Sequence, residues 1–199
     1  MVDLAILIPA AGASARMRGS DKLMEEVGGT SALRHAAMLA ARISPRVFVT
    51  LPEGGPHAAP RRAELAGLGV TALPLADAHE GMAASLRAGA RAAGNAEGLM
   101  ILLPDMPDIT EADLRLLVEV FSAEPTAPAR LGTPDGRDGH PVILPLRLFP
   151  GVLVLAGDEG ARRVLAGEEV NLVLLDDDRA LRDLDTPEAW AEWRARRTA

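Results

Sequence analysis

Short apolar runs alternate with Ala- and Leu-rich stretches along most of this chain. The apolar runs have the length and composition of buried strands, and the stretches between them have the period of helices. We expect strands at residues 4–8, 47–51, 70–73, 99–103, 141–144 and 171–175. This alternation is typical of an α/β fold with a mostly parallel sheet covered by helices.

Helices are expected between these strands, at residues 31–43, 61–68, 82–93, 111–121, 160–166 and 187–196. Two starts carry local signals: Thr110 precedes Glu111 and Asp113, and Thr186 precedes a proline at the first helical position. Trp190 and Trp193, three positions apart on the last helix, are expected to dock it against the sheet. The length of 199 residues predicts a single domain over residues 1–199.

Two segments rich in Gly and Pro interrupt the pattern, at residues 52–60 and 124–139. Neither has a helical or strand period, so both are expected to be loops. The second lies between the predicted strands that end before Asp105 and begin after His140. It is therefore a candidate flap on the substrate side.

The amino-acid composition and the net charge exclude some classes of binding partner. Hydrophobic residues make up 48% of the sequence but aromatic residues only 3%, so no row of rings is available to stack nucleic-acid bases. The net charge of -7 opposes binding to a polyanion, and we expect no nucleic-acid partner. Cysteine is absent, and the apolar stretch 4–13 is too short for a membrane span, so a cytoplasmic location without a membrane partner is expected.

Tiny residues follow the first predicted strand and would let a ligand approach the backbone N–H groups. The segment is not a dinucleotide fingerprint, because Ser14 stands where a glycine is needed, and it is not a P-loop, because Asp21 and Leu23 flank Lys22. The candidate nucleotide-binding residues in it are Ala10, Ala11, Gly12, Ala13 and Ser14.

Two cations accompany this loop in a protein that is acidic overall. Arg16 offers a planar fork for phosphate oxygens, and Lys22, six positions later, offers a mobile point charge. Both are candidate catalytic residues. The alternative is that Arg16, Arg18 and Lys22 only solvate a surface loop.

Asp105 is the candidate metal ligand. It follows the buried run 99–103, and the carboxyl end of a central strand is where open α/β sheets bind ligands. Mg²⁺ needs only one or two protein carboxylates besides phosphate oxygens and water. The alternative is an aspartate that caps a turn between Pro104 and Pro107.

The segment from Pro9 to Leu23 resembles the signature of the MobA-like nucleotidyltransferases, with the same spacing between Arg16 and Lys22. Asp105-Met-Pro is similar to the family's Gly-Asp-Met-Pro, and Asp183-Leu-Asp185-Thr-Pro to its Asp-x-Asp-Thr-Pro. Two positions depart from the family: Arg18 stands where the first glycine is usual, and Pro104 replaces the glycine before Asp105.

This resemblance implies a three-layer α/β/α Rossmann-like nucleotidyltransferase fold and a Mg²⁺ cofactor. It makes Arg16, Lys22 and Asp105 catalytic and gives Asp185 as a second metal ligand, although Asp185 is equally placed to stabilise a helix start. The Ala-Ala-Gly form of the loop is similar to the molybdenum cofactor cytidylyltransferase (MocA-like) branch. That branch favours CTP over GTP.

Three further segments match the family in its order along the chain. Gly81 and Ser85 fall in the segment that holds the nucleotide, while His140, Asp158 and Arg162 fall in segments that face the acceptor. An acid-base role for His140 is not needed, because the attacking phosphate oxygen is already anionic near pH 7.

The resemblance implies transfer of CMP from CTP to the phosphate of a molybdopterin-type (molybdenum) cofactor, with a molybdoenzyme or its chaperone as protein partner. Two alternatives stay open at this point. One is a transferase that uses GTP or another small phosphorylated acceptor, and the other is a non-catalytic nucleotide sensor or cofactor chaperone.

Overall fold

The computed structural model describes residues 2–197 and contains a seven-stranded sheet in the order β5-β4-β1-β6-β8-β7-β9. Its strands are β1 (Leu4–Pro9), β4 (Arg46–Pro52), β5 (Thr71–Leu75), β6 (Gly98–Ile101), β7 (Ala129–Gly132), β8 (Asp138–Pro145) and β9 (Asn171–Leu174). A separate hairpin consists of β2 (Glu26–Val27) and β3 (Thr30–Ser31).

The sheet is mostly parallel, as the alternation of apolar runs predicts. β1 pairs in parallel with β4 and β6, β4 pairs in parallel with β5, and β7 with β9. Only β8 runs antiparallel to its two neighbours, β6 and β7. The six predicted strands correspond to β1, β4, β5, β6, β8 and β9.

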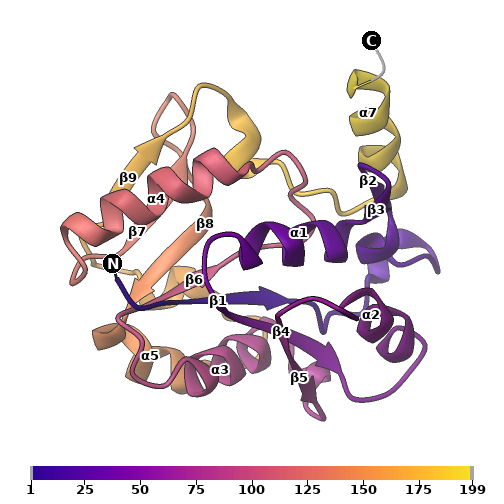
Figure 1. The fold of residues 1–199 in the computed structure, drawn as a ribbon, viewed down its shortest axis with the longest axis horizontal. Helices are drawn as coiled ribbons and strands as arrows, with labels where there is room; N and C mark the ends of the chain where they lie inside the picture. The colour runs from indigo at the N-terminus through magenta and orange to yellow at the C-terminus, as the bar shows by residue number, and fades with distance from the viewer. Residues whose placement is uncertain (1, 198–199) are drawn as a thin grey trace.

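Helices cover both faces of the sheet and make three layers (Figure 1). α1 (Ala32–Ala41) and α4 (Glu111–Ala123) pack on one face, while α3 (Met82–Ala93), α5 (Phe149–Leu153) and α6 (Ala161–Val164) pack on the other. In β1, Ile6 and Ile8 join the first core and Ala5 and Leu7 the second. A strand buried on both faces is apolar throughout, which is why no polar alternation marks it.

Both segments expected to be irregular contain regular structure. α2 (Ala58–Glu64) begins inside 52–60, with Pro60 in its first turn, where a proline removes no helical hydrogen bond. Segment 124–139 contains β7, which lies between β8 and β9, and the first residues of β8, so part of the expected flap belongs to the sheet. Arg130 and Gly132 hide this strand from the hydrophobic pattern. α5 was also not predicted.

Short 3-10 helices occur at η1 (Ala15–Met17), η2 (Lys22–Met24), η3 (Ala78–Glu80), η4 (Leu146–Leu148) and η5 (Asp178–Leu181). Those nearest the start of the chain shape the loop that follows β1. The sequence pattern predicts neither a helix nor a strand in this loop, and η1 and η2 are the regular structure that it contains.

The last helix, α7 (Pro187–Arg197), lies beside the β2–β3 hairpin, apart from the sheet (Figure 1). Its Trp190 and Trp193 are buried in a small cluster with Met17, Val27 and Ala32, so the expected docking against the main sheet is wrong. The two rings meet edge-on, with centroids 5.7 Å apart. α7 therefore packs on the segment that carries the cationic loop.

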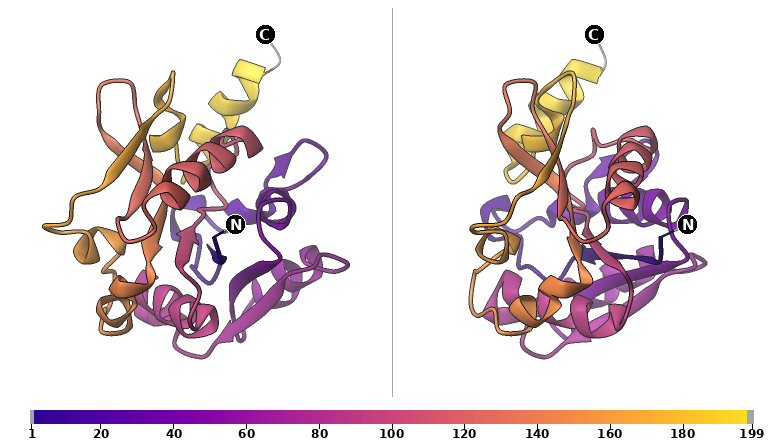
Figure 2. Two further views of the ribbon diagram at one scale, coloured as in Figure 1. Left: turned by 60° about the vertical axis from the view of Figure 1, so that its left-hand side comes forward. Right: turned by 90° about the vertical axis from the view of Figure 1, so that its left-hand side faces the viewer.

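The strands that follow β1 along the chain are added on both sides of it: β4 lies on one side of β1 and β6 on the other. The loops that leave the carboxyl ends of β1 and β6 therefore meet at a topological switch point, the usual ligand site of such sheets. Figure 2 gives the turned views of this arrangement. No helix among residues 2–197 is long and apolar enough to cross a bilayer.

Candidate active site

The loop after β1 leaves the sheet through backbone that is open to a ligand. A Cβ added at Gly12 would meet no atom within 4 Å, so packing inside the protein does not exclude a side chain at this position. Ser14 adopts a left-handed conformation with φ 51° and starts η1, whose Met17 is buried in the α7 cluster. This anchor fixes the stretch on which Arg16 lies.

The unusual Arg18 also sits in left-handed backbone, with φ 52°. This is a conformation that glycine adopts freely and that costs other L-residues about 1–2 kcal/mol. The family's glycine at this position is thus explained by backbone geometry. In this chain the Arg18 side chain reaches Glu188 of α7 at 2.8 Å, on the exposed surface.

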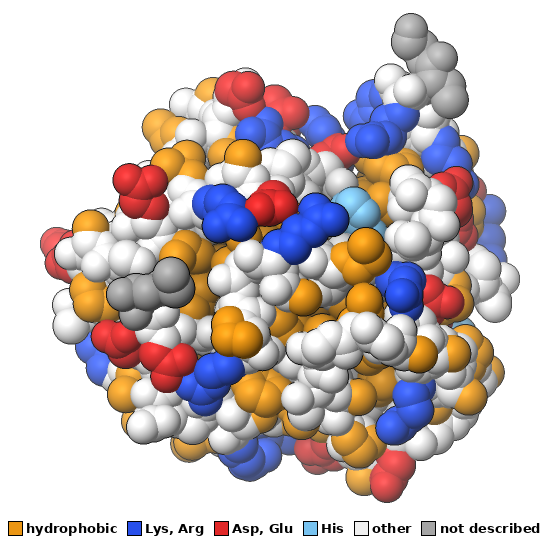
Figure 3. All heavy atoms as spheres, viewed as in Figure 1, with side chains coloured by type: hydrophobic (Ala, Val, Ile, Leu, Met, Phe, Trp, Pro, Cys, Tyr) orange, Lys and Arg blue, Asp and Glu red, His pale blue; other side chains and the backbone are white. Residues whose placement is uncertain are grey.

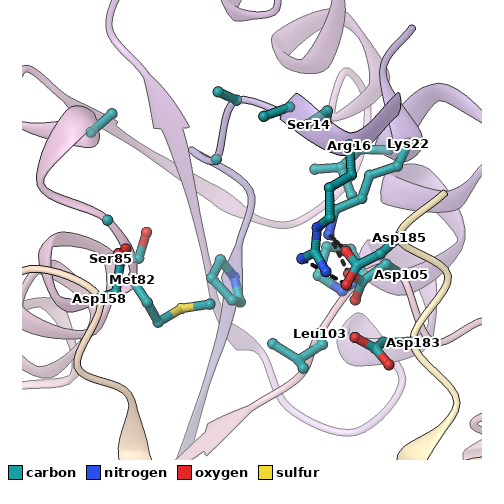
Figure 4. Close-up of a pocket in the computed structure, with 18 of the residues that line it drawn as sticks. Ser14, Arg16, Lys22, Met82, Ser85, Leu103, Asp105, Asp158, Asp183 and Asp185 are labelled. Atoms are coloured by element: carbon teal, nitrogen blue, oxygen red, sulfur yellow. Dashed lines mark hydrogen bonds and ion pairs between the residues drawn. The ribbon is translucent and has the colours of Figure 1, made fainter. Parts of the chain in front are cut away.

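Lys22 joins two carboxylates from distant parts of the chain (Figure 4). Its Nζ lies 2.5 Å from Asp105 Oδ2 and 2.7 Å from Asp185 Oδ1. Arg16 Nη2 lies 2.7 Å from the other oxygen of Asp185. The structure therefore brings together all four residues that the sequence singled out as catalytic or metal-binding.

These charges shift one another's titration. Burial alone lowers the pKa of Lys22, but the charges and hydrogen bonds of Asp105 and Asp185 outweigh it and raise that pKa above its ordinary value. Burial likewise raises the pKa of Asp185, yet Lys22 reverses the effect and the net direction is downward. Lys22 is therefore a charged ammonium near pH 7.

Asp183 is a third carboxylate at this place, beyond the residues that the sequence motifs single out. It lies on the same side of the cavity as Asp185 (Figure 4). Burial and the neighbouring Asp185 carboxylate raise the pKa of Asp183. The signal for it was present in the Asp-x-Asp spacing, which in an extended segment points two side chains to the same side.

The donor set fits a divalent metal. Asp105 Oδ1 is buried and has no hydrogen-bond partner among the described residues, while Oδ2 holds Lys22. Carboxylate oxygens are the ligands that Mg²⁺ and Mn²⁺ prefer. No group of three or more acidic or imidazole side chains among residues 2–197 is arranged as a complete metal cage. A site with one or two protein carboxylates, completed by phosphate oxygens, suits this arrangement.

A cavity of about 550 Å³ opens beside these charges. Its walls come from the loop after β1, the start of α3, the loop after β6 and the segment before α7. Ten predicted site residues line it: Gly12, Ala13, Ser14, Arg16, Lys22, Gly81, Ser85, Asp105, Asp158 and Asp185. The volume is in the range of small-molecule sites in proteins.

The opposite wall is built by two loops in close contact. Gly81 has φ 86°, and a Cβ there would lie 2.2 Å from Asp158 Oδ1. The amide of Ala83 also donates to the carbonyl of Gly157 at 3.1 Å. The segment expected to hold the nucleotide and one expected to face the acceptor are therefore in direct contact. Ser85 is buried and bonds to Thr50 Oγ1 at 3.0 Å.

Four predicted residues lie outside this cavity: Ala10, Ala11, His140 and Arg162. Ala10 and Ala11 are buried, and Arg162 is exposed. Burial, with the charge of Arg130, lowers the pKa of His140 to about 4, so its ring is neutral near pH 7. Residues that line the cavity but were not singled out include Pro9, Ala78, His79, Met82 and Leu103.

Comparison with known proteins agrees with this geometry. The model of the MobA-like NTP transferase domain matches residues 6–173. The chain is also 32% identical to the purine catabolism protein PucB of Bacillus subtilis (strain 168), over 91% of each chain. The chain belongs to the MobA-like NTP transferase family.

Several solved structures are similar to this chain over nearly its whole length. Rv0371c from Mycobacterium tuberculosis H37Rv is 27% identical, with a TM-score of 0.82 over 96% of both chains. Its manganese complex is 25% identical, with a TM-score of 0.77 over 96% of this chain and 97% of that one. A nucleotidyl transferase from Methanothermobacter, 18% identical with a TM-score of 0.79 over 98% and 99%, shares the fold.

Proposed function

We propose that this NTP transferase is a Mg²⁺-dependent cytidylyltransferase that transfers CMP from CTP to the phosphate of a molybdopterin-type cofactor. The observation that carries the proposal is Lys22, held by Asp105 and Asp185 beside a loop of tiny residues. A cationic group that two carboxylates hold beside this loop is placed to stabilise the charge that develops during transfer at the α-phosphate.

Arg16, Lys22 and the loop amides would hold the triphosphate. With nucleotide bound, the ammonium of Lys22 would turn from its carboxylates toward phosphate oxygens. The flexible four-carbon stem of lysine allows this movement. Lys22 is already charged, because the carboxylates raise its pKa. It therefore stabilises negative charge that builds up on the α-phosphate without any proton transfer.

The bond changes follow from the acceptor's chemistry. An anionic oxygen of the acceptor phosphate bonds to the α-phosphorus of CTP, and the bond from that phosphorus to the bridging oxygen breaks. Pyrophosphate leaves with the bonding electrons, so a general base is not required.

Asp105 and Asp185 would hold Mg²⁺, with the unpartnered Asp105 Oδ1 as the free ligand atom. When bound, the metal neutralises the charge of the triphosphate and of the departing pyrophosphate. Asp183 lies close enough to influence this pair by its charge.

The preference for CTP and for this acceptor rests on narrower grounds. Ala10 and Ala11 before Gly12 give the loop form of the cytidylyltransferase branch. His140, Asp158 and Arg162 stay candidates for the acceptor, with Asp158 alone of the three lining the cavity. The first alternative is a transferase that uses GTP or another small phosphorylated acceptor.

A non-catalytic sensor or cofactor chaperone is the second alternative. A protein that only binds nucleotide has no need for a cation and two carboxylates gathered at the phosphate loop, and Lys22 with its partners argues against it. A molybdoenzyme or its chaperone is the protein partner that either role would require.

The test is pyrophosphate release from each nucleoside triphosphate, with Mg²⁺ and molybdopterin or its molybdenum form as acceptor. We expect release with CTP, and a loss of at least about 100-fold in kcat/KM for Asp105→Asn, which keeps the side-chain shape but removes the metal-binding charge.

Asp108→Asn is the matched control, because Asp108 lies three residues further on and bonds to Trp193 outside the cavity. Release with GTP alone would support the first alternative. Nucleotide binding without release in the presence of either acceptor form would contradict the proposed enzyme.

A further inference from the structure

A fully buried arginine lies beneath the loop after β1. Arg61 of α2 has an exposed fraction of 0%, and it does not line the cavity. A buried guanidinium is strongly destabilising unless its charge is paired and its donors are satisfied. The placement of Arg61 therefore requires a set of fixed acceptors, and all of them come from the loop.

Each of the five N–H groups of Arg61 has an acceptor. Nε and one Nη2 hydrogen bind the two oxygens of Asp21, both at 2.8 Å, as a bidentate pair. Nη1 donates to the carbonyls of Ala10 at 2.8 Å and Gly12 at 2.7 Å, and Nη2 also donates to Ser14 Oγ at 3.1 Å. One side chain thus fixes both ends of the segment 10–21.

The two carbonyl contacts set the direction of the loop amides. In a planar trans peptide, the carbonyl of one residue and the N–H of the next point in opposite directions. Because the carbonyls of Ala10 and Gly12 point at Arg61, the N–H groups of Ala11 and Ala13 point away from it. Arg61 therefore turns donors of this loop toward the side where an anion can bind.

Asp21 extends the same contact to Lys22. Its carboxylate accepts from the amide of Leu23 at 3.1 Å and so caps the turn η2, which begins at Lys22. It also accepts from Ser14 Oγ at 3.0 Å. Burial raises the pKa of Asp21, but Arg61 outweighs it and lowers that pKa, so the pair is ionised near pH 7.

We propose that Arg61 is a positioning residue for the triphosphate loop: it aims the loop amides and fixes the start of the Lys22 turn without touching substrate. This inference rests on the proposed nucleotidyl transfer. The charge of Arg61 is balanced by Asp21. Arg61 therefore fixes the shape of the loop, and Arg16 and Lys22 are the cations of this loop that line the cavity.

The test compares Arg61→Lys with Arg34→Lys. Arg34 of α1 donates to the carbonyls of Glu64 and Ala66, at and just beyond the carboxyl-terminal end of α2, and both acceptors lie outside the loop. Both variants keep the charge and lose the guanidinium fork. Hydrogen exchange measured by mass spectrometry reports on residues 10–22 directly, and calorimetry with inorganic pyrophosphate and Mg²⁺ reports on phosphate binding.

For Arg61→Lys we expect exchange in residues 10–22 to speed up about tenfold and the KM for nucleotide to rise about tenfold, with the acceptor KM unchanged. Arg34→Lys should leave both at wild-type values. Asp21→Asn, which breaks the bidentate pair from the other side, should repeat the effect of Arg61→Lys.

Unchanged exchange in Arg61→Lys, or equal acceleration in Arg34→Lys, would overturn the proposal, because the effect would then be absent or a general loosening of α2. If no nucleotide is turned over by the wild-type protein, the proposed function fails by itself. The exchange and pyrophosphate-binding results still decide the role of Arg61 in that case, because neither depends on turnover.

Discussion

His140 is a partly exposed imidazole in β8 whose Nδ1 atom is buried. Burial and the charge of Arg130 lower its pKa, Asp105 partly opposes them, and the net value is about 4. Its Nδ1 has no hydrogen-bond partner among the described residues. The ring is therefore held neutral by its surroundings and adds no charge to the site near pH 7.

We predict that the NMR titration of His140, assigned by comparison with His140→Gln, has its midpoint near pH 4. Because the folded pKa lies below the ordinary value of 6.5, the unfolded chain binds more protons between these values. The stability linked to His140 is complete above about pH 6.5 and falls as the pH drops toward 4. A midpoint near 6.5 would contradict this placement of the ring.

At the level of the element, α4 shows how a local signal fixes a helix. The sequence predicts its start from Thr110, Glu111 and Asp113, and the structure confirms it with a capping box between Thr110 and Asp113. The same Asp113 carboxylate binds Arg179 at 2.9 Å, from a segment far along the chain. One buried side chain thus serves both the helix start and its docking.

We predict that Asp113→Asn lowers the free energy of unfolding at pH 7 by about 2 kcal/mol, because it removes the charge that pairs with Arg179 and weakens the capping box with Thr110. Burial raises the pKa of Asp113, but Arg179 and Thr110 lower it overall. A lowered carboxylate pKa gives stability that is present above the ordinary value of 3.8 and is lost as the pH falls through the folded value.

Urea unfolding at several pH values checks this, and the difference from wild type should shrink below about pH 4. Asp176→Asn is the matched control, because Asp176 pairs with the same Arg179 but its side chain is 86% exposed. An equal loss of stability in both variants would show that burial of Asp113 contributes nothing.

Elements differ in how much of them the sequence reveals. The strand run of β1 and the helix α3 follow from apolar pattern alone, because both bury residues at a regular period. β7 is short and includes Arg130, whose buried guanidinium donates to the carbonyl of Gly139 and pairs with the carboxylate of Asp138 at 3.0 Å. Both partners lie on the neighbouring strand β8, so no local pattern predicts β7.

The residues of the candidate site also differ in how far the sequence alone predicts them. Arg16, Lys22 and Asp105 were found because small-residue loops and strand ends carry local signals. The sequence does not single out Arg61, because it directly follows the Gly- and Pro-rich segment 52–60 and its acceptors belong to a loop 40 to 51 residues earlier. Its role exists only in the folded chain.

On the scale of the whole molecule, acidic and basic side chains are interspersed on the face in Figure 3. Ion pairs such as Arg42–Glu111 and Arg46–Asp3 cross between elements on the surface. Together with the net charge of -7, this distribution offers no extended basic surface on that face. Phosphate binding is therefore expected at the local site beside Lys22, as the composition predicts.

The cluster under α7 connects two distant parts of the chain, and Met17 lies at its centre with an exposed fraction of 1%. We predict that Met17→Ala lowers the free energy of unfolding by about 3 kcal/mol, through lost apolar burial and the cavity left behind. Both tryptophans of the protein belong to this cluster, so denaturant unfolding followed by tryptophan fluorescence measures its loss.

Leu116→Ala is the control for the loss of a large apolar side chain, because Leu116 is 43% exposed on α4. It should change stability far less than Met17→Ala. A fluorescence transition of Met17→Ala that coincides with that of the wild type would mean that α7 holds without this contact.

The triangle of Lys22, Asp105 and Asp185 also has a consequence for biosynthesis. Lys22 is 83 residues from Asp105 and 163 residues from Asp185. At a synthesis rate of about 5–20 residues per second, a growing chain carries the first two residues for on the order of several seconds before the third exists. The nascent protein is thus without the complete cluster of these three side chains while the sheet on which the cluster rests is still being made.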